Sequence, residues 1–277
     1  MTLAKIPLVA VLGSPVAHSK SPLLHGFWLK KFGISGHYVP IDVTATDLEL
    51  VLKNLPKMGF VGANVTLPHK EKIISIADQI SDRAALIGAA NTLVFQPDGK
   101  LYADNTDGYG FIENIRQHAP DWRATDGPAL VLGAGGAARA IVSALLEAGA
   151  PEVYISNRTR SRADQIKSDF GARVSVVEWV KASTEIEHTH TLVNTTSLGM
   201  TGKPALNISL QGLRPETLVT DIVYTPLETE FLQAARSKGS TVVDGLGMLI
   251  HQAVPGFERW FGQKPVVDQE IRDILIP

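Results

Sequence analysis

At 277 residues, with 44% hydrophobic and 19% charged residues, the sequence has the balance of a soluble globular protein long enough for two domains. Its formal net charge of −2 gives no overall attraction to nucleic acid or to an anionic membrane, so a small molecule is the expected partner. The absence of cysteine excludes disulfides, thiolate metal ligands and a cysteine nucleophile, and leaves any redox chemistry to a bound cofactor.

The amino-terminal segment predicts a strand rather than a targeting signal. The apolar run at 6–12 is short, contains Pro7 and leads into Gly13. No run of eighteen consecutive apolar residues occurs, and the most apolar long stretch, 129–146, carries a glycine turn and Arg139, so no membrane span is expected. We therefore expect a cytoplasmic protein.

Short apolar runs alternate with helical patterns along the chain, which predicts an α/β protein with mostly parallel sheets. In the first third, strands are expected at 8–13, 38–43, 62–66 and 91–95, the last turning through 97–99 into 101–103 as a hairpin. Helices are expected between them at 22–32, 46–55 and 70–77.

A second series of strands is expected at 129–132, 152–156, 173–176, 191–194, 218–222 and 241–243. Six such strands suit the sheet of a Rossmann-type dinucleotide-binding domain. Residues 119–128 read as a surface passage between the two series, and the helical pattern after 243 as a segment that returns to the first domain. We predict a substrate-binding and catalytic domain at 1–107 plus 246–277, and a dinucleotide-binding domain at 108–245.

The glycine-rich turn at 133–139 is the surest single feature. A strand-like run precedes it and a helical pattern follows, as a pyrophosphate site requires, because glycines let the backbone turn sharply and the first helical N–H groups face the phosphates. Ala138 stands where the fingerprint permits alanine for its third glycine. The residues expected to contact the dinucleotide are Gly133, Ala134, Gly135, Gly136 and Ala137.

The end of the next strand favours NADP over NAD. An enzyme that uses NAD places an acidic residue there for the ribose 2′-hydroxyl, whereas this sequence continues as Asn157-Arg158-Thr159-Arg160-Ser161-Arg162. The alternative is a solvated basic helix start, which is unusual because cations oppose the dipole at a helix N-terminus. A bound 2′-phosphate would remove that conflict.

Polar residues of the first domain follow its strands, at the edge where α/β sheets bind ligands. Ser19 and Ser21 come after the first strand, Thr66 and Lys70 after the third, and Asn91 and the run 104–107 close the set. Some of them have an alternative structural role. Ser21 can cap the helix that begins with Pro22, the lysine can be solvated, and residues 104–107 can cap a helix that begins near 108.

The motifs together resemble the shikimate dehydrogenase family over nearly the whole chain. The resemblance rests on Ser-Lys-Ser-Pro at 19–22, Asn-Val-Thr-Leu-Pro-His-Lys at 64–70, Ala-Asn-Thr at 90–92, Asp-Asn-Thr-Asp-Gly at 104–108, the glycine turn, Asn-Arg-Thr at 157–159 and Asp-Gly-Leu-Gly-Met-Leu at 244–249. It implies the reversible reduction of 3-dehydroshikimate to shikimate with NADPH, a step of the chorismate pathway in aromatic amino-acid biosynthesis.

The resemblance also implies site residues. Lys70 and Asp107 match the catalytic pair, and the positions that match substrate contacts are Ser19, Ser21, Thr66, Asn91, Tyr224 and Gln252. The cofactor positions beyond the glycine turn are Asn157, Arg158, Thr159, Arg162 and Gly245. A lysine with its ordinary pKa of about 10.4 is a poor base at neutral pH but a good donor to an incipient alkoxide, so Asp107 is expected to orient and stabilise the ammonium. The proton route stays open.

Alternatives to this assignment remain. His18, His69 and His251 adjoin proposed site residues but are expected to have packing or substrate-shell roles, and no histidine or carboxylate spacing predicts a metal. A quinate or quinate/shikimate dehydrogenase is the closest rival, and a non-catalytic NADPH-binding regulatory protein is a second. The sequence leaves a homodimer open.

Overall fold

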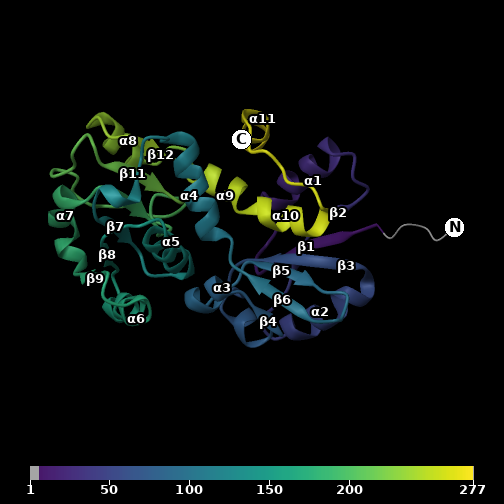
Figure 1. The fold of residues 1–277 in the computed structure, drawn as a ribbon. Coiled ribbons are helices and arrows are strands. Elements are labelled where there is room, and N and C mark those ends of the chain that lie inside the picture. The colour runs from purple at the N-terminus through teal and green to yellow at the C-terminus, as the bar shows by residue number, and fades with distance from the viewer. Residues whose placement is uncertain (1–5, 277) are drawn as a thin grey trace. The chain divides into compact units, whose positions relative to one another are not determined.

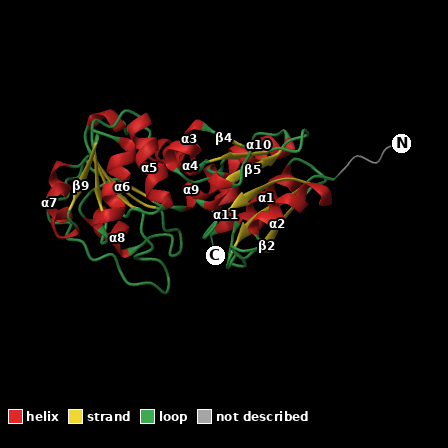
Figure 2. Ribbon diagram, turned by 90° about the horizontal axis from the view of Figure 1, so that it is seen from below, coloured by secondary structure: helices red, strands yellow, loops and turns green. Residues whose placement is uncertain are grey.

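The computed structural model describes residues 6–276, and the chain divides into two compact units, Met1–Thr106 with Gln252–Pro277, and Asp107–His251. Each unit has its own six-stranded sheet with helices packed on it (Figures 1 and 2). The α/β class expected from the sequence is confirmed. The division into a substrate-binding and an NADP-binding domain at the predicted limits remains a prediction.

The first unit has a mixed sheet. Its strands are β1 (Leu8–Gly13), β2 (His37–Asp42), β3 (Phe60–Val65), β4 (Gln79–Ile80), β5 (Thr92–Phe95) and β6 (Leu101–Asp104), and its helices are α1 (Ser21–Lys31), α2 (Leu48–Asn54), α3 (Asp82–Ile87), α10 (Ala253–Phe261) and α11 (Gln269–Leu275). The strand order is β2-β1-β3-β5-β6-β4. The β5–β6 pair is the expected hairpin, and β5 is antiparallel to both β3 and β6, while the other pairings are parallel.

Strand β1 is buried on both of its faces, as the apolar run from residue 8 requires. Ala10 and Leu12 pack in the cluster that includes Leu48 and Leu52 of α2, and Val9 and Val11 pack with the cluster of Trp260 in α10. Successive side chains of a strand point to opposite faces. A strand without a polar face therefore lies in the middle of the layered unit.

Residues 70–77 were expected to form a helix, and this prediction is wrong. They form only a short 3₁₀ turn at Lys72–Ser75. The cause lies just beyond the turn, where the Asp78 N–H donates to the carbonyl of Leu101 at 3.0 Å and the Asp78 carboxylate accepts from the Leu101 N–H at 2.8 Å. These contacts draw the chain into edge strand β4, which the sequence did not predict.

The second unit has the doubly wound order expected of a dinucleotide-binding sheet. Its strands are β7 (Ala129–Leu132), β8 (Val153–Ser156), β9 (Val174–Val177), β10 (Thr191–Asn194), β11 (Leu218–Asp221) and β12 (Val242–Val243), and its helices are α4 (Asp107–His118), α5 (Gly136–Glu147), α6 (Arg160–Phe170), α7 (Ala182–Glu185), α8 (Glu230–Ser237) and α9 (Leu246–His251). All pairings in the order β12-β11-β10-β7-β8-β9 are parallel. The Rossmann-type fold is confirmed.

Helices cover both faces of this sheet, and β7 shows the two faces by alternation. Ala129 and Val131 belong to the cluster that includes residues of α4, α5 and α6, whereas Leu130 and Leu132 belong to the cluster with α7 and α8 (Figure 1). The continuous apolar run at 129–132 therefore reflects burial of both faces.

Two segments pack differently from what the sequence suggested. The passage at 119–128 lies inside the second unit and is partly buried, because the Trp122 Nε1–H donates to Thr191 Oγ1 at 2.9 Å and Ala124 is buried. Helix α9 packs on α4 in the second unit, although the predicted limits placed it with the first, while α10 and α11 pack on the first unit as expected. Among residues 6–276, no helix is long and apolar enough to cross a membrane.

Candidate active site

The glycine turn of the second unit follows β7 and requires glycine at its first position. Gly133 has a φ of +112°, and an added Cβ would lie 2.5 Å from Thr195 Oγ1. Its N–H donates to the carbonyl of Ser156 at 2.7 Å, which fixes the turn to the neighbouring strand. At Gly135 and Gly136 an added Cβ would meet no atom within 4 Å, and no side chain caps the start of α5. The turn therefore leaves the first amides of a twelve-residue helix open to an anion.

The three arginines after β8 differ in their partners. Arg160 is paired with Asp164 at 3.6 Å and Glu178 at 3.4 Å. Arg158 and Arg162 are exposed and form no ion pair with any described residue between 6 and 276. Among residues 6–276, the guanidinium groups of Arg158 and Arg162 therefore have no carboxylate partner. These are the two arginines that were expected at the 2′-phosphate.

The turn that carries these arginines is shaped by Asn157, whose side-chain amide donates to the carbonyl of Thr159 at 2.8 Å. Thr159 precedes α6 without a side-chain cap hydrogen bond. The last residue of β8 is Ser156, which is buried, so the acidic group typical of NAD enzymes is absent at this strand end.

In the first unit, the strand directions bring several chain segments to one edge of the sheet. Strands β1 and β3 are parallel and end at residues 13 and 65, and the antiparallel β5 begins at this same edge, directly after Asn91. Strand β6 ends there as well, before Thr106. The serines and Thr66, which follow β1 and β3, and Asn91, which precedes β5, therefore belong to segments that meet at one edge of the sheet.

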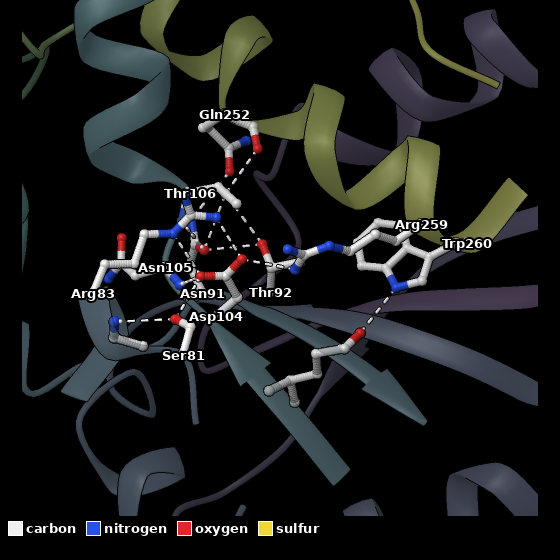
Figure 3. A network of polar contacts seen from close by, with 12 residues as sticks. Ser81, Arg83, Asn91, Thr92, Asp104, Asn105, Thr106, Gln252, Arg259 and Trp260 are labelled. Atoms are coloured by element: carbon white, nitrogen blue, oxygen red, sulfur yellow. Dashed lines mark hydrogen bonds and ion pairs between the residues drawn. The ribbon is translucent and has the colours of Figure 1, made fainter. Parts of the chain in front are cut away.

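Asn91 lies at the centre of the polar network at this edge (Figure 3). Its Oδ1 accepts from the Thr106 N–H and from Thr92 Oγ1, both at 2.9 Å, and its Nδ2 donates to Gln252 Oε1 at 3.2 Å. Because a main-chain N–H can only donate, the hydrogen bond from the Thr106 N–H fixes which atom of the Asn91 amide is the oxygen. Thr106 also donates from its hydroxyl to the Gln252 carbonyl at 2.8 Å, so Asn91 and Gln252, 161 positions apart, are held together.

Next to Asn91 lies the fully buried carboxylate of Asp104 (Figure 3). It accepts from Ser81 Oγ, from the guanidinium of Arg83 and from Arg259 Nη1, each at 2.7 Å or less. Burial opposes its ionisation, but the hydrogen bonds from Arg83 and Ser81 and the charges of both arginines hold its pKa below the ordinary value. The main-chain carbonyl of Asp104 also accepts from the Asn91 N–H at 3.0 Å, so the hydrogen bonds of Asp104 help to hold Asn91 in place. The capping role considered for Asp104 is therefore wrong.

The serines form the other end of the edge. The Ser21 N–H donates to Ser19 Oγ at 3.3 Å, and the N-cap of α1 is Lys20, so the capping role considered for Ser21 is also wrong. The neighbouring residue Tyr38 is buried, and burial holds the pKa of its hydroxyl far above the ordinary value, with a smaller opposing effect from Ser21. Tyr38 donates from its hydroxyl to Asn64 Oδ1 at 2.7 Å.

Asn64 joins the two ends of the edge. Its Nδ2 donates to the Asn91 carbonyl at 3.0 Å and to Thr92 Oγ1 at 3.3 Å, while its Oδ1 accepts from Tyr38. Sequence reasoning missed the roles of Tyr38 and Asn64. The signal available was the placement of Asn64 inside a buried strand, since a buried amide needs partners for every polar atom.

Thr66 and Lys70 are held beside this network by their backbones. The Thr66 N–H donates to Leu12 O at 2.9 Å, and a Cβ on Gly13 would clash with the Thr66 methyl group. The Lys70 carbonyl accepts from the Ala90 N–H at 2.9 Å, one residue before Asn91.

Two of the three histidines next to the site residues have structural contacts. The ring of His69 is buried with Nε2 2.7 Å from the Val43 carbonyl, and His251 Nε2 lies 2.8 Å from Gln117 Oε1. His18 is exposed in the loop after β1. These contacts give His69 and His251 the packing roles that were expected.

The remaining site residues belong to the second unit. Asp107 is the buried first residue of α4 and follows Thr106 directly. Tyr224 lies in the loop between β11 and α8, and burial raises the pKa of its hydroxyl. Gly245 packs against this loop, because a Cβ there would lie 2.6 Å from the Val223 carbonyl.

The doubly wound sheet and its glycine turn define a Rossmann-type dinucleotide-binding protein with a separate α/β unit. Family models agree: residues 11–93 match the shikimate dehydrogenase substrate binding domain, 116–202 match shikimate / quinate 5-dehydrogenase, and 245–269 match the shikimate 5′-dehydrogenase C-terminal domain. The chain belongs to the shikimate dehydrogenase family.

Individual relatives are similar over nearly the full chain. A shikimate dehydrogenase (NADP(+)) of Paracoccus denitrificans is 62% identical, covering 98% of this chain and 96% of that protein. The structure of shikimate 5-dehydrogenase from Thermus thermophilus with NADP(H) and shikimate is 38% identical, with a TM-score of 0.86, covering 98% of this chain and 100% of that one. A quinate dehydrogenase from Corynebacterium glutamicum with NAD is 30% identical, with a TM-score of 0.90, covering 98% and 99%.

Proposed function

We propose that the chain catalyses the reversible, NADP-dependent reduction of 3-dehydroshikimate to shikimate. The observation that carries the proposal is the network around Asn91 and Gln252, at the sheet edge where Thr66, Lys70 and the serines also follow their strands. Directed hydrogen bonds of this kind suit a small polyhydroxylated acid. Relatives with the same activity, 62% identical in the example above, support the assignment.

Hydroxyl and amide groups bind the substrate in this proposal. The residues that contact the carboxylate and hydroxyls are Ser19, Ser21, Thr66, Asn91, Gln252 and Tyr224. The fixed orientation of the Asn91 amide supports such a role, because a rigid donor discriminates between substrates that place an oxygen correctly and those that do not.

Lys70 and Asp107 act as the catalytic pair. When NADPH is bound, it supplies the hydride that reduces the ketone carbon. The Lys70 ammonium hydrogen-bonds the ketone oxygen and stabilises the negative charge that develops there, and a proton reaches this oxygen as the hydroxyl forms. The Asp107 carboxylate keeps the ammonium charged and oriented.

The second unit holds NADP. The pyrophosphate binds at Gly133, Ala134, Gly135, Gly136 and Ala137, with Gly245 completing the cofactor contacts. The adenosine 2′-phosphate binds Asn157, Arg158, Thr159 and Arg162. The absence of ion pairs at Arg158 and Arg162 within residues 6–276 supports this assignment, since both are available for bidentate contacts with a phosphate.

Replacement of Lys70 tests the catalytic assignment. We expect Lys70→Ala to lower kcat about 10²- to 10⁴-fold with a smaller change in the KM for shikimate, because the ammonium acts mainly on the developing charge. Lys72→Ala, two residues along and exposed, is the matched control and should leave kcat unchanged. NADP⁺ reduction followed at 340 nm measures both constants. A near-normal kcat in Lys70→Ala would remove this lysine from the mechanism.

Quinate oxidation with NAD is the second candidate, favoured by the likeness to the quinate dehydrogenase structure. The two exposed arginines and the missing acid after β8 weigh against it. Initial rates with shikimate and quinate, each with NADP⁺ and NAD⁺, separate the two, and we expect shikimate with NADP⁺ to give the highest kcat/KM. No turnover with either substrate would instead favour a non-catalytic NADPH-binding protein.

A location in the cytoplasm and a homodimeric assembly complete the proposal. Sedimentation velocity of the purified protein measures the second, with a mass near 30 kDa expected for a monomer and twice that for a dimer. Fractionation of cells that express the full chain measures the first.

A further inference from the structure

Two neighbouring strands of the second unit end in a buried polar pair. Asn194 ends β10 and Asp221 ends β11, and the two are partners in the parallel register. The Asn194 Nδ2 donates to Asp221 Oδ1 at 3.0 Å, and both residues are at most 1% exposed. Most buried polar groups are hydrogen-bonded, and the bonds of this pair give it a defined geometry.

Asp221 closes the loop that carries Tyr224. Its Oδ1 accepts from the Val223 N–H at 2.9 Å, at the start of the loop, and its Oδ2 accepts from Thr229 Oγ1 at 2.8 Å, at the end. Burial raises the pKa of Asp221, although these hydrogen bonds and the one from Asn194 oppose that effect. One carboxylate therefore ties both ends of a loop in which Tyr224 follows Val223 directly.

Thr229 has a second contact that fixes the direction of its hydroxyl. It is fully buried and is the N-cap of α8, where its hydroxyl accepts from the Leu232 N–H at 3.4 Å while it donates to Asp221. A hydroxyl has one hydrogen, so the direction of both bonds is fixed. The end of the loop is thus anchored to the helix and to the sheet at once.

Asn194 holds the loop that follows β10 in a similar way. Its Oδ1 accepts from the Thr196 N–H at 3.0 Å and from the Thr196 hydroxyl at 2.8 Å, and its Nδ2 donates to the Leu198 carbonyl at 3.1 Å. Thr196 lies next to Gly133, where an added Cβ would be 3.0 Å from the Thr196 methyl group. The absence of a side chain at Gly133 therefore lets the loop after β10 approach the glycine turn. The Thr201 N–H donates to the Thr225 carbonyl at 2.9 Å, so the two loops also bond each other.

We infer that Asp221 and Thr229 are positioning residues for Tyr224, holding its loop in the conformation that binds the substrate. The inference rests on the proposed role of Tyr224 in substrate binding. Neither residue is proposed to touch the substrate or the cofactor. Their effect should therefore appear as a change in the KM for shikimate that depends on Tyr224 being present, and not as a loss of NADPH binding.

Thr229→Val tests the inference, because valine keeps the shape of threonine and removes only the hydroxyl. We expect the KM for shikimate to rise about tenfold, the effect of losing one buried hydrogen bond, with the Kd for NADPH within about twofold of the unchanged protein. Thr229→Ser should restore the KM. Thr217→Val is the matched control: Thr217 is equally buried and donates to the Thr189 carbonyl at 2.9 Å, but it precedes β11 at the opposite end of the strand.

A double-mutant cycle with Tyr224→Phe separates positioning from a general loss of stability. If Thr229 acts through Tyr224, the KM of the double variant should equal that of Tyr224→Phe alone, whereas independent effects would multiply. Asp221→Asn supplies a second, nearly isosteric variant for the same cycle should Thr229→Val fold poorly.

The KM values of these variants separate the positioning role of Asp221 and Thr229 from the proposed substrate contact of Tyr224. A raised KM in Tyr224→Phe together with an unchanged KM in Thr229→Val and Asp221→Asn would overturn the positioning role and leave the proposed substrate contact standing. An unchanged KM in Tyr224→Phe would refute the substrate contact and the inference with it. An equal rise in KM for Thr217→Val would assign the effect to stability and also overturn the inference.

Discussion

His25 should make the stability of the first unit depend on pH well above the range of the carboxylates. The ring has no exposed surface and stacks on Tyr38 at a centroid distance of 4.0 Å, with Trp28, Phe257 and Trp260 around it. Neither ring nitrogen has a well-oriented hydrogen-bond partner among residues 6–276. Burial lowers the pKa of His25 to about 3, and the side chain of Asn64 opposes this effect in part.

The effect of pH on the free energy of unfolding follows from the difference between the pKa of His25 in the folded and unfolded protein. The folded protein holds the ring neutral while the unfolded chain binds a proton below its ordinary pKa of about 6.5, so the stabilisation is complete above pH ~6.5 and is lost as the pH falls toward ~3. Each pH unit below 6.5 costs about 1.4 kcal/mol. Between pH 7 and pH 5 the free energy of unfolding should therefore fall by about 2 kcal/mol through His25 alone.

Urea unfolding at pH 7 and pH 5 measures this loss. Trp28 and Trp260 report on the first unit when the tryptophans of the second, Trp122 and Trp179, are replaced by phenylalanine in every variant compared. His25→Phe keeps an aromatic ring in the stack and should reduce the pH dependence by about 2 kcal/mol.

The control for this measurement is His37→Gln, which removes an exposed histidine of the first unit and should leave the pH dependence as it was. Equal losses between pH 7 and pH 5 in His25→Phe and in the unsubstituted background would refute the assignment of the effect to His25.

Three further substitutions test the cofactor site and the support beneath Asn91. Gly133→Ala would place a Cβ 2.5 Å from Thr195 Oγ1 at a φ of +112°, and we expect NADPH affinity to fall at least about tenfold in a fluorescence titration; unchanged affinity would contradict the close-approach argument. Glutamine at both Arg158 and Arg162 should weaken NADPH far more than NADH in the same titration, because only NADPH carries the 2′-phosphate, and an equal loss would remove these residues from cofactor choice. Asp104→Asn removes the negative charge that Arg83 and Arg259 share and should cost about 2–3 kcal/mol in urea unfolding, less than a fully buried pair because both arginines reach solvent; a loss below about 0.5 kcal/mol would contradict it.

The Rossmann-type unit could be predicted from sequence because its signals are local. A strand buried on both faces reads as a continuous apolar run, and the glycine turn follows within the next residue, as at 129–136. The order of the six strands then follows from the fold class. None of these steps needed a contact between distant residues.

The polar network of the first unit could not be predicted in the same way, because its partners are far apart in the chain. In the sequence, Asp104 could cap the helix that follows it, yet its carboxylate accepts hydrogen bonds from Ser81, Arg83 and Arg259. Arg259 is 155 positions from Asp104 in the chain. No local pattern distinguishes such an arginine from a solvated one. Tyr38 was similarly hidden, since an aromatic residue in a strand usually indicates packing alone.

The arginine cluster lies between these cases. Arg158, Arg160 and Arg162 look equivalent as a run of alternate residues, but α6 begins at Arg160, which places Asp164 four residues along the same helical face. That spacing was already present in the sequence and predicts a paired Arg160. The pairing of Arg160 with Asp164 could therefore be predicted once the start of the helix was fixed, and only the contact with Glu178 required the folded chain.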